Sequence, residues 1–213
     1  MIPTGKGDST RPAVFLDRDG TINAEKGYVY RPSDWEWLPG SVEAIARFNR
    51  MGFLVVVVTN QAGIARGLFR ETDVRRLHDT VNRMLAARGS RIDAYYICPH
   101  HPDFGKVRHC PCRKPSPGLL FRAQRELGID LRRSYLIGDK ASDIAAGRAA
   151  GVTSILVGTG YGSCERSRVP RSTPFVDDLL AASEWVRSDL ARRNPGRKWG
   201  APLSPAVAGS GQK

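Results

Sequence analysis

The sequence has no long apolar run. No stretch of its 213 residues reaches the roughly 20 consecutive apolar residues that a membrane-spanning helix requires. Residues 1–11 lack the apolar core of a secretion signal, so we expect a cytoplasmic protein that does not bind membranes. Cysteine is also scarce, with four residues, which argues against the dense disulfide framework of small secreted domains. Hydrophobic residues make up 41% and charged residues 25%, the composition of an ordinary globular protein.

Acidic residues are fewer than basic ones. The 21 Asp and Glu residues face 33 Lys and Arg residues, which leaves a net charge of +12. Such a charge is typical of nucleic-acid-binding proteins. The arginines are scattered over several predicted helices, however, and no aromatic platform accompanies them. We therefore interpret most of the charge as a solvated surface, with attraction for an anionic small molecule as a second contribution. A zinc-stabilised nucleic-acid-binding protein is the alternative outside the enzymes.

Apolar runs alternate with amphipathic segments along the chain. Residue types of buried strands predict strands at 13–16, 53–59, 94–98, 134–138 and 153–157. Helices are predicted at 40–51, 71–88, 117–127, 142–150 and 175–191. This alternation predicts an α/β fold in which a mostly parallel sheet is covered by helices on both faces. We expect one domain over residues 1–191, without a large cap domain. Residues 192–213, rich in Pro, Gly, Ser and Ala, are expected to form a disordered tail.

Polar clusters follow four of the predicted strands, where ligands bind in open α/β sheets. These clusters are Asp17-Arg18-Asp19, Thr59-Asn60-Gln61, Cys98-Pro99-His100 and Gly138-Asp139-Lys140. Asp17 and Asp19 lie two residues apart on an extended segment, so we expect both to face one site. Two adjacent carboxylates suit a hard divalent cation such as Mg²⁺. A carboxylate can also attack phosphorus as a nucleophile.

The polar motifs carry a family resemblance. FLDRDGTIN (residues 15–23) is followed in order by Thr59, Lys114 and GDKASD (residues 138–143). With these motifs the chain resembles the haloacid dehalogenase (HAD) phosphohydrolase superfamily. The resemblance implies a three-layer, Rossmann-like HAD fold and a phosphatase that forms an aspartyl phosphate.

The resemblance also implies a role for each motif residue. Asp17 is expected to be the nucleophile and Asp19 the general acid/base. Thr59 and Lys114 are expected to hold the phosphoryl oxygens. The ligands implied for a catalytic Mg²⁺ are Asp17, Asp19 and Asp139. Asp143 is either a neighbour of the metal ligands or a helix cap.

A second group of residues suits zinc. The candidate thiolate ligands are Cys98, Cys110 and Cys112, and the candidate nitrogen ligands are His100, His101 and His109. Three thiolates and one imidazole are typical of a structural Zn²⁺ site. The segment CPHHPDFGKVRHCPCRKPSPG, with TNQAGIARG and GDKASDI, resembles the histidinol-phosphatase-related subfamily of the HAD superfamily, which implies His100 as the fourth ligand. We expect the zinc loop, residues 98–112, to aim Arg113 and Lys114 into the pocket.

The subfamily resemblance further implies which residues contact the substrate. These are Arg18, Glu25, Lys26, Gly27, Tyr28, Asn60, Gln61, Ala62, Arg113 and Lys140. Ala62 stands where serine is common, which removes one hydroxyl donor. Arg113, Lys114 and Lys140 would bring three cations to one rim, which fits an anionic sugar bisphosphate. The motifs favour a heptose bisphosphate over histidinol phosphate or another small phosphomonoester, and the resemblance leans to a monomer.

Overall fold

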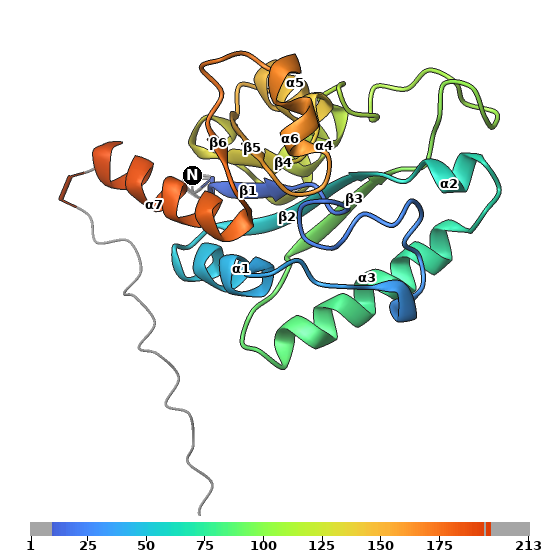
Figure 1. Ribbon diagram of the computed structural model, residues 1–213, viewed down its shortest axis with the longest axis horizontal. Helices are drawn as coiled ribbons and strands as arrows, with labels where there is room; N and C mark the ends of the chain where they lie inside the picture. Colours follow the sequence, from blue (N-terminus) through green and yellow to red (C-terminus); the bar gives the residue numbers. More distant parts are fainter. Residues whose placement is uncertain (1–9, 194, 197–213) are drawn as a thin grey trace, which may run out of the picture.

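The computed structural model describes residues 10–193 and 195–196, which form a central sheet between two layers of helices (Figure 1). Within this part of the chain the sheet has six strands in the order β3-β2-β1-β4-β5-β6, and all neighbouring strands are parallel. The strands are β1 (Ala13–Leu16), β2 (Leu54–Asn60), β3 (Ala94–Cys98), β4 (Tyr135–Gly138), β5 (Thr153–Val157) and β6 (Phe175–Val176). The strand order reverses direction between β1 and β4, as in the Rossmann fold, and ligands bind at such a reversal.

Helices connect the strands. They are α1 (Ser41–Arg50), α2 (Ala62–Ala65), α3 (Glu71–Ala86), α4 (Gly118–Leu127), α5 (Ala141–Ala149), α6 (Gly162–Glu165) and α7 (Leu179–Arg193). Short 3₁₀ turns cover Pro32–Asp34, Leu131–Arg133 and Arg166–Arg168. In the part of the chain described here, no helix combines the length and the apolar character that crossing a membrane demands.

Each face of the sheet has its own core. Val14 and Leu16 of β1 pack with apolar residues of α1, α3 and α7. Ala13 and Phe15, which point the other way, pack with residues of α4 and α5. Strand β2 is β-branched over most of its length and is buried on both faces. Packing on both faces holds the central strands in place, and because the strands are parallel, their carboxyl ends lie next to one another.

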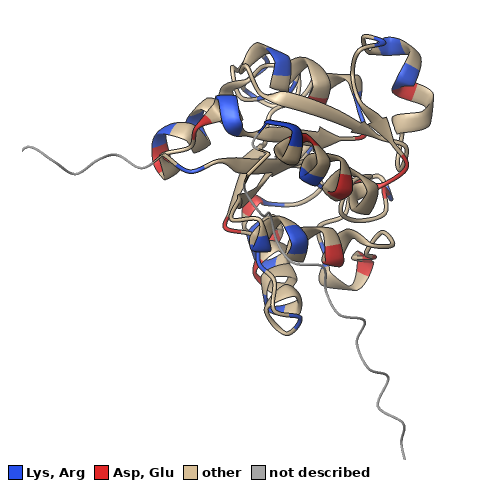
Figure 2. Ribbon diagram, turned by 90° about the vertical axis from the view of Figure 1, so that its left-hand side faces the viewer, with Lys and Arg blue, Asp and Glu red and all other residues tan. Residues whose placement is uncertain are grey.

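The charged surface is mixed rather than divided into patches. Figure 2 shows Lys and Arg on several helices, with Asp and Glu among them. Three arginines pair with a glutamate one helical turn away: Arg47 with Glu43, Arg75 with Glu71 and Arg122 with Glu126. This arrangement agrees with the interpretation of the excess positive charge as mostly solvated surface.

Most predicted elements are confirmed, and the segment before α7 is a correction. Phe175 and Val176 form the edge strand β6 instead of beginning a helix, because β5 binds their backbone: the N–H groups of Leu156 and Gly158 donate to Pro174 and Val176. The helix begins at Leu179, where the preceding Asp178 accepts a hydrogen bond of 2.8 Å from the N–H of Ala181. Helix α7 continues to Arg193, so the first two residues of the expected tail are helical. Residues 194 and 197–213 of that tail lie outside the described residues.

Candidate functional site

A pocket of about 340 Å³ opens at the carboxyl ends of β1, β2 and β4. Leu16 pairs with Val57 on one side and with Ile137 on the other, so the polar residues that follow these strands come together. The predicted catalytic residues in its lining are Asp17, Asp19, Thr59 and Lys114. The predicted substrate-binding residues in its lining are Glu25, Gly27, Tyr28, Asn60, Gln61, Ala62, Arg113 and Lys140.

The turn after β1 depends on a glycine. Gly20 has a φ of 83°, in the left-handed region, and a Cβ there would collide with the Asp139 carboxylate. Gly160, with a φ of 57°, approaches the same carboxylate from the segment after β5. Two loops from opposite sides of the strand reversal therefore close directly onto Asp139.

Three carboxylates form a cluster at the pocket, where Asp17 and Asp143 belong to the lining and Asp139 is fully buried beside them. Asp17, Asp139 and Asp143 each offer an oxygen, and these oxygens lie within 4.8 Å of one another. Asp139 Oδ2 accepts a hydrogen bond of 2.9 Å from the Tyr161 N–H, whereas Oδ1 is buried without a partner. Burial, and then the charge of Asp17, raises the pKa of Asp139 to about 8. The crowded charges and the unpartnered oxygen fit a hard divalent cation.

Lys114 connects two of these carboxylates. Its Nζ lies 2.8 Å from Asp17 Oδ1 and 2.6 Å from Asp143 Oδ1, and it donates a hydrogen bond of 2.7 Å to the Val58 carbonyl. Burial opposes the charge on Lys114, but the Asp143 and Asp17 carboxylates outweigh it and raise the pKa of the amine. Lys114 is therefore a buried cation aimed at Asp17.

Asp143 is both a neighbour of the predicted metal ligands and a helix cap, the two alternatives that the sequence left open. Its Oδ2 accepts a hydrogen bond of 3.0 Å from the N–H of Lys140 and caps α5, while Oδ1 contacts Lys114. Burial raises the pKa of Asp143 to about 6 against the opposing charge of Lys114. A Cβ at position 138 would collide with this carboxylate, which explains the glycine at the end of β4.

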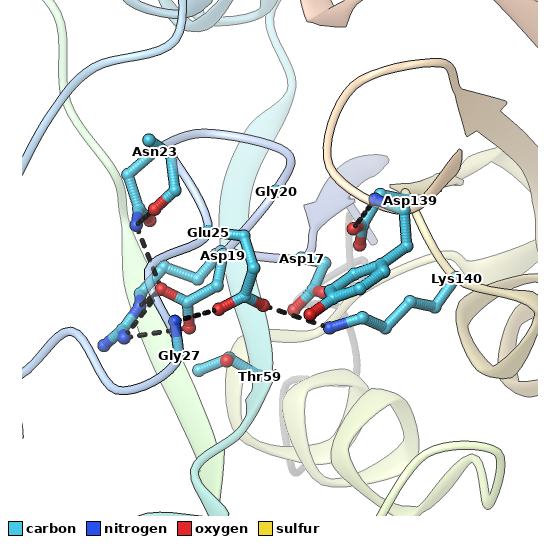
Figure 3. Close-up of polar contacts among 12 residues, drawn as sticks. Asp17, Asp19, Gly20, Asn23, Glu25, Gly27, Thr59, Asp139 and Lys140 are labelled. Atoms are coloured by element: carbon cyan, nitrogen blue, oxygen red, sulfur yellow. Dashed lines mark hydrogen bonds and ion pairs between the residues drawn. The ribbon is translucent and has the colours of Figure 1, made fainter. Parts of the chain in front are cut away.

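The side chain of Asp19 does not belong to the cluster. Figure 3 shows Asp17 between Asp19 and Asp139, with Asp19 directed towards Asn23. Its carboxylate accepts hydrogen bonds from Arg18, Asn23 and Gln61 at 2.9, 2.9 and 3.1 Å. Asp17 and Asp139 of the predicted Mg²⁺ ligands thus come together, and the third carboxylate beside them is Asp143.

The pocket rim carries charges of both signs. Lys140 Nζ lies 3.3 Å from Glu25 Oε2 and 4.6 Å from the centre of the Tyr161 ring. Arg113 donates a hydrogen bond of 3.0 Å to the His100 carbonyl, which ties it to the Cys/His loop. The side chain of Asn60 bonds the backbone of Lys114 in both directions, at 3.0 and 3.1 Å.

Two predicted substrate-binding residues are absent from the described pocket lining. Lys26 pairs with Glu36 at 2.7 Å on the surface. Arg18 is fully buried behind Asp19. The sequence reasoning in turn missed Tyr161, whose backbone binds Asp139. The one available signal was the density of glycines at residues 158–162, which permits close approach of the backbone.

The predicted zinc ligands also come together. Cys98, His100, Cys110 and Cys112 offer three sulfur atoms and the His100 Nδ1 within 4.8 Å of one another. The individual separations recorded among them run from 3.1 to 3.9 Å. All three cysteines are free thiols. The donor set suits a tetrahedral zinc site, and the cluster lies directly before Arg113 and Lys114 in the chain.

Comparisons with known proteins agree with this geometry. A family described as HAD-hydrolase-like matches residues 111–182. The D-glycero-beta-D-manno-heptose-1,7-bisphosphate 7-phosphatase of Yersinia pestis is 43% identical over 185 residues, which cover 84% of this chain and 92% of the relative. The phosphatase of the same name from Photorhabdus laumondii is 48% identical over 153 residues, which cover 70% of this chain and 81% of the relative.

Solved structures support the same relationship. The crystal structure of a D,D-heptose 1,7-bisphosphate phosphatase from B. bronchiseptica, complexed with magnesium and phosphate, has a TM-score of 0.77. It is 38% identical in sequence, and the match covers 84% of this chain and 99% of that one. The corresponding phosphatase from Burkholderia thailandensis has a TM-score of 0.62 at 36% identity, with 82% of this chain and 97% of that one covered. The chain is a phosphatase of the HAD superfamily and belongs to the family of the heptose bisphosphate phosphatases.

Proposed function

We propose that the chain is a Mg²⁺-dependent phosphatase that removes the 7-phosphate of D-glycero-D-manno-heptose 1,7-bisphosphate through an aspartyl phosphate on Asp17. The observation that carries this proposal is the position of Asp17: it directly follows strand β1, and its carboxylate faces the pocket and contacts the buried Lys114 at 2.8 Å. A nucleophile next to a fixed cation is the arrangement that phosphoryl transfer requires.

The reaction would have two steps. In the first, an oxygen of Asp17 forms a bond to phosphorus, the bond between phosphorus and the sugar oxygen breaks, and Asp19 gives its proton to that oxygen. In the second, Asp19 takes a proton from water, the water oxygen attacks the phosphorus of the aspartyl phosphate, and the Asp17 carboxylate leaves. Lys114 and Thr59 would hold the phosphoryl oxygens, whose charge they offset during transfer.

Asp17, Asp139 and Asp143 would hold the Mg²⁺ ion. The unpartnered, buried Oδ1 of Asp139 and the raised pKa of this carboxyl support that assignment. When bound, Mg²⁺ supplies positive charge that offsets the carboxylates and the transferring phosphoryl group. The relative from B. bronchiseptica was crystallised with magnesium and phosphate, which supports the same metal here.

The rim would select a doubly phosphorylated sugar. Arg113 and Lys140 are the cations available for a second phosphate at a distance from Asp17, and Glu25 is an acceptor for sugar hydroxyl groups. Histidinol phosphate carries neither a second phosphate nor a sugar ring, so a rim of this composition favours the bisphosphate. The curated relatives act on the β anomer by name, and we propose the same anomer for this chain.

The experiment that tests this function measures phosphate release from both anomers of the heptose bisphosphate and from histidinol phosphate, with Mg²⁺ and with EDTA. We expect the highest kcat/KM for the β bisphosphate and loss of turnover in EDTA. The Asp17→Asn variant should be folded and inactive, with no phosphorylated protein detected by mass spectrometry. Full activity of Asp17→Asn would exclude the covalent route, and a preference for histidinol phosphate would exclude the proposed substrate.

Cys98, His100, Cys110 and Cys112 would hold a structural Zn²⁺ ion. All four protein ligands of a tetrahedral ion are present, so such a site keeps no open position for substrate. Three neighbouring free thiols also fit a reducing compartment, which supports the cytoplasm as the location. We further propose that the chain acts as a monomer and without nucleic acid; light scattering and a mobility-shift titration at low salt test these two points.

A further inference from the structure

A fully buried arginine lies behind the proposed general acid/base. The side chain of Arg18 is 0% exposed, and its guanidinium binds Asp19 through two nitrogens: Nη2 donates to Oδ1 and Oδ2 at 2.9 Å each, and Nε donates to Oδ1 at 3.2 Å. Nη2 also donates to the Val29 carbonyl at 2.5 Å. Burying an arginine costs free energy unless its donors are satisfied. Arg18 therefore does not serve as a surface contact for substrate.

His78, 60 residues further along the chain, accepts a hydrogen bond from the other terminal nitrogen of the guanidinium. Its Nε2 lies 3.4 Å from Arg18 Nη1. The imidazole is 5% exposed and stacks on the Tyr95 ring at 4.1 Å with an interplanar angle of 14°. Burial, and then the charge of Arg18, lowers the pKa of His78 to about 3, so the ring is neutral and its Nε2 is free to accept. Helix α3 and strand β3 thereby hold the arginine in place.

The remaining contacts leave Asp19 a single arrangement. Asn23 donates to Oδ1 and Gln61 donates to Oδ2, and Gln61 also donates to Thr59 Oγ1 at 2.9 Å. Each oxygen of the carboxylate is thus held by more than one donor: Oδ1 by Arg18 and Asn23, and Oδ2 by Arg18 and Gln61. Without these donors, a bound divalent cation would attract the carboxylate, and Asp19 would become a metal ligand instead of a proton carrier.

We propose that Arg18 and His78 are positioning residues that hold the Asp19 carboxylate away from the metal ligands and beside the leaving oxygen. The inference rests on the proposed function, because it assigns the pair to the proton transfers that Asp19 makes there. Arg18 acts on Asp19 directly, and His78 acts through Arg18. A displacement of about 1 Å in a reacting group is enough to lower turnover about 100-fold.

The test compares two leaving groups. A sugar alkoxide needs a proton as it departs, whereas p-nitrophenolate departs without one. A displaced Asp19 carboxyl group should therefore slow the first turnover of the sugar bisphosphate and leave the first-turnover burst of p-nitrophenyl phosphate unchanged. For Arg18→Gln we expect kcat on the bisphosphate to fall about 100-fold with KM within about threefold of wild type, and the nitrophenolate burst rate to change less than about threefold. Arg18→Lys should recover part of the loss, because it keeps the charge.

The His78 variants extend the test without removing the buried charge. His78→Leu deletes the acceptor and should lower kcat about 10-fold on the bisphosphate, with the burst spared; His78→Gln supplies another acceptor and should recover most of that loss. Val81→Ala is the matched control, since Val81 is fully buried one turn further along α3 and its side chain can form no hydrogen bond with Arg18. It should lower the melting temperature and leave unchanged the ratio of kcat on the bisphosphate to the nitrophenolate burst rate.

Three results would overturn the inference: equal loss on both substrates, an increase in KM with unchanged kcat, or a wild-type ratio in both His78→Leu and Arg18→Lys. If Arg18→Gln does not fold, the last two variants decide the question. Asp19→Asn separates this inference from the proposed function. If Asp19→Asn keeps full activity on the bisphosphate, the role of Asp19 itself fails; if it loses activity while the Arg18 and His78 variants do not, only the positioning pair fails.

Discussion

Asp17 and Asp19 are two residues apart, yet their carboxylates meet different partners. Asp17 contacts Lys114 and lies with the carboxylates of Asp139 and Asp143, whereas Asp19 is surrounded by hydrogen-bond donors. The motif around them was enough to predict that both face one pocket, which they do. It did not predict the burial of Arg18, which was expected to contact substrate, because the contact with His78 crosses 60 residues and has no local pattern. Contacts of this kind depend on how α3 packs, which residue spacing does not encode.

At the residue scale, His78 predicts how stability depends on pH. Its pKa is lowered from 6.5 to about 3 in the folded chain, so the unfolded chain binds more protons between these values and stability falls as the pH drops below about 6.5. Between pH 7 and pH 5 the loss from this residue is roughly 2 kcal/mol. Urea unfolding of wild type and His78→Gln at both pH values measures it. The variant should lose about 2 kcal/mol less than wild type over this interval; equal losses would contradict the prediction.

At the scale of elements, strands were predicted well where β-branched runs are long. Strand β2 was expected at residues 53–59 and spans Leu54–Asn60. Strand β6 was missed because two residues carry no periodicity, and its pairing with β5 supplies the backbone partners that define it. The four candidate ligands of the Cys/His loop were predicted from the sequence, and their ligand atoms do come together. Its attachment to the pocket through Asn60 and Arg113 follows from tertiary packing alone.

The Cys/His loop predicts a link between zinc and activity. Cys112→Ser should reduce zinc content from one ion per chain to none, lower the melting temperature by roughly 5 °C or more, and reduce kcat because Lys114 loses its fixed approach to Asp17. Metal analysis, calorimetry and turnover on one preparation measure the three effects. Cys164→Ser is the control, since this cysteine is exposed on α6 and lies outside the cluster. Retention of zinc in Cys112→Ser would contradict the assignment.

At the scale of the whole molecule, the carboxylate cluster predicts that folding and magnesium binding are linked. Asp17, Asp139 and Asp143 repel one another in the folded state, and a cation relieves that repulsion only there. At a Mg²⁺ concentration of about 100 times Kd, the gain in stability is roughly 2.7 kcal/mol, or roughly 5–10 °C in melting temperature for a chain of this size.

Thermal melts with and without Mg²⁺ test this linkage in two variants. Asp139→Asn should show little increase with Mg²⁺, because it removes a ligand, and should melt above wild type in EDTA, because it removes a carboxyl group whose ionisation is opposed in the folded state by burial and by the charge of Asp17. Asp79→Asn, which changes an exposed carboxylate on α3, should keep the full increase. The same increase in both variants would contradict the assignment of the metal ligands.

The position of β1 has a consequence for how the molecule opens. This strand is paired on both edges and buried on both faces, so its amides should be among the slowest in the protein to exchange hydrogen for deuterium. Lys114 lies instead on the segment that follows β3, an edge strand that is paired on one side only. During local unfolding, the segment that carries Lys114 should therefore move away from Asp17, while β1 stays in place. When the segment refolds, the pocket would form again on the unchanged carboxyl end of β1.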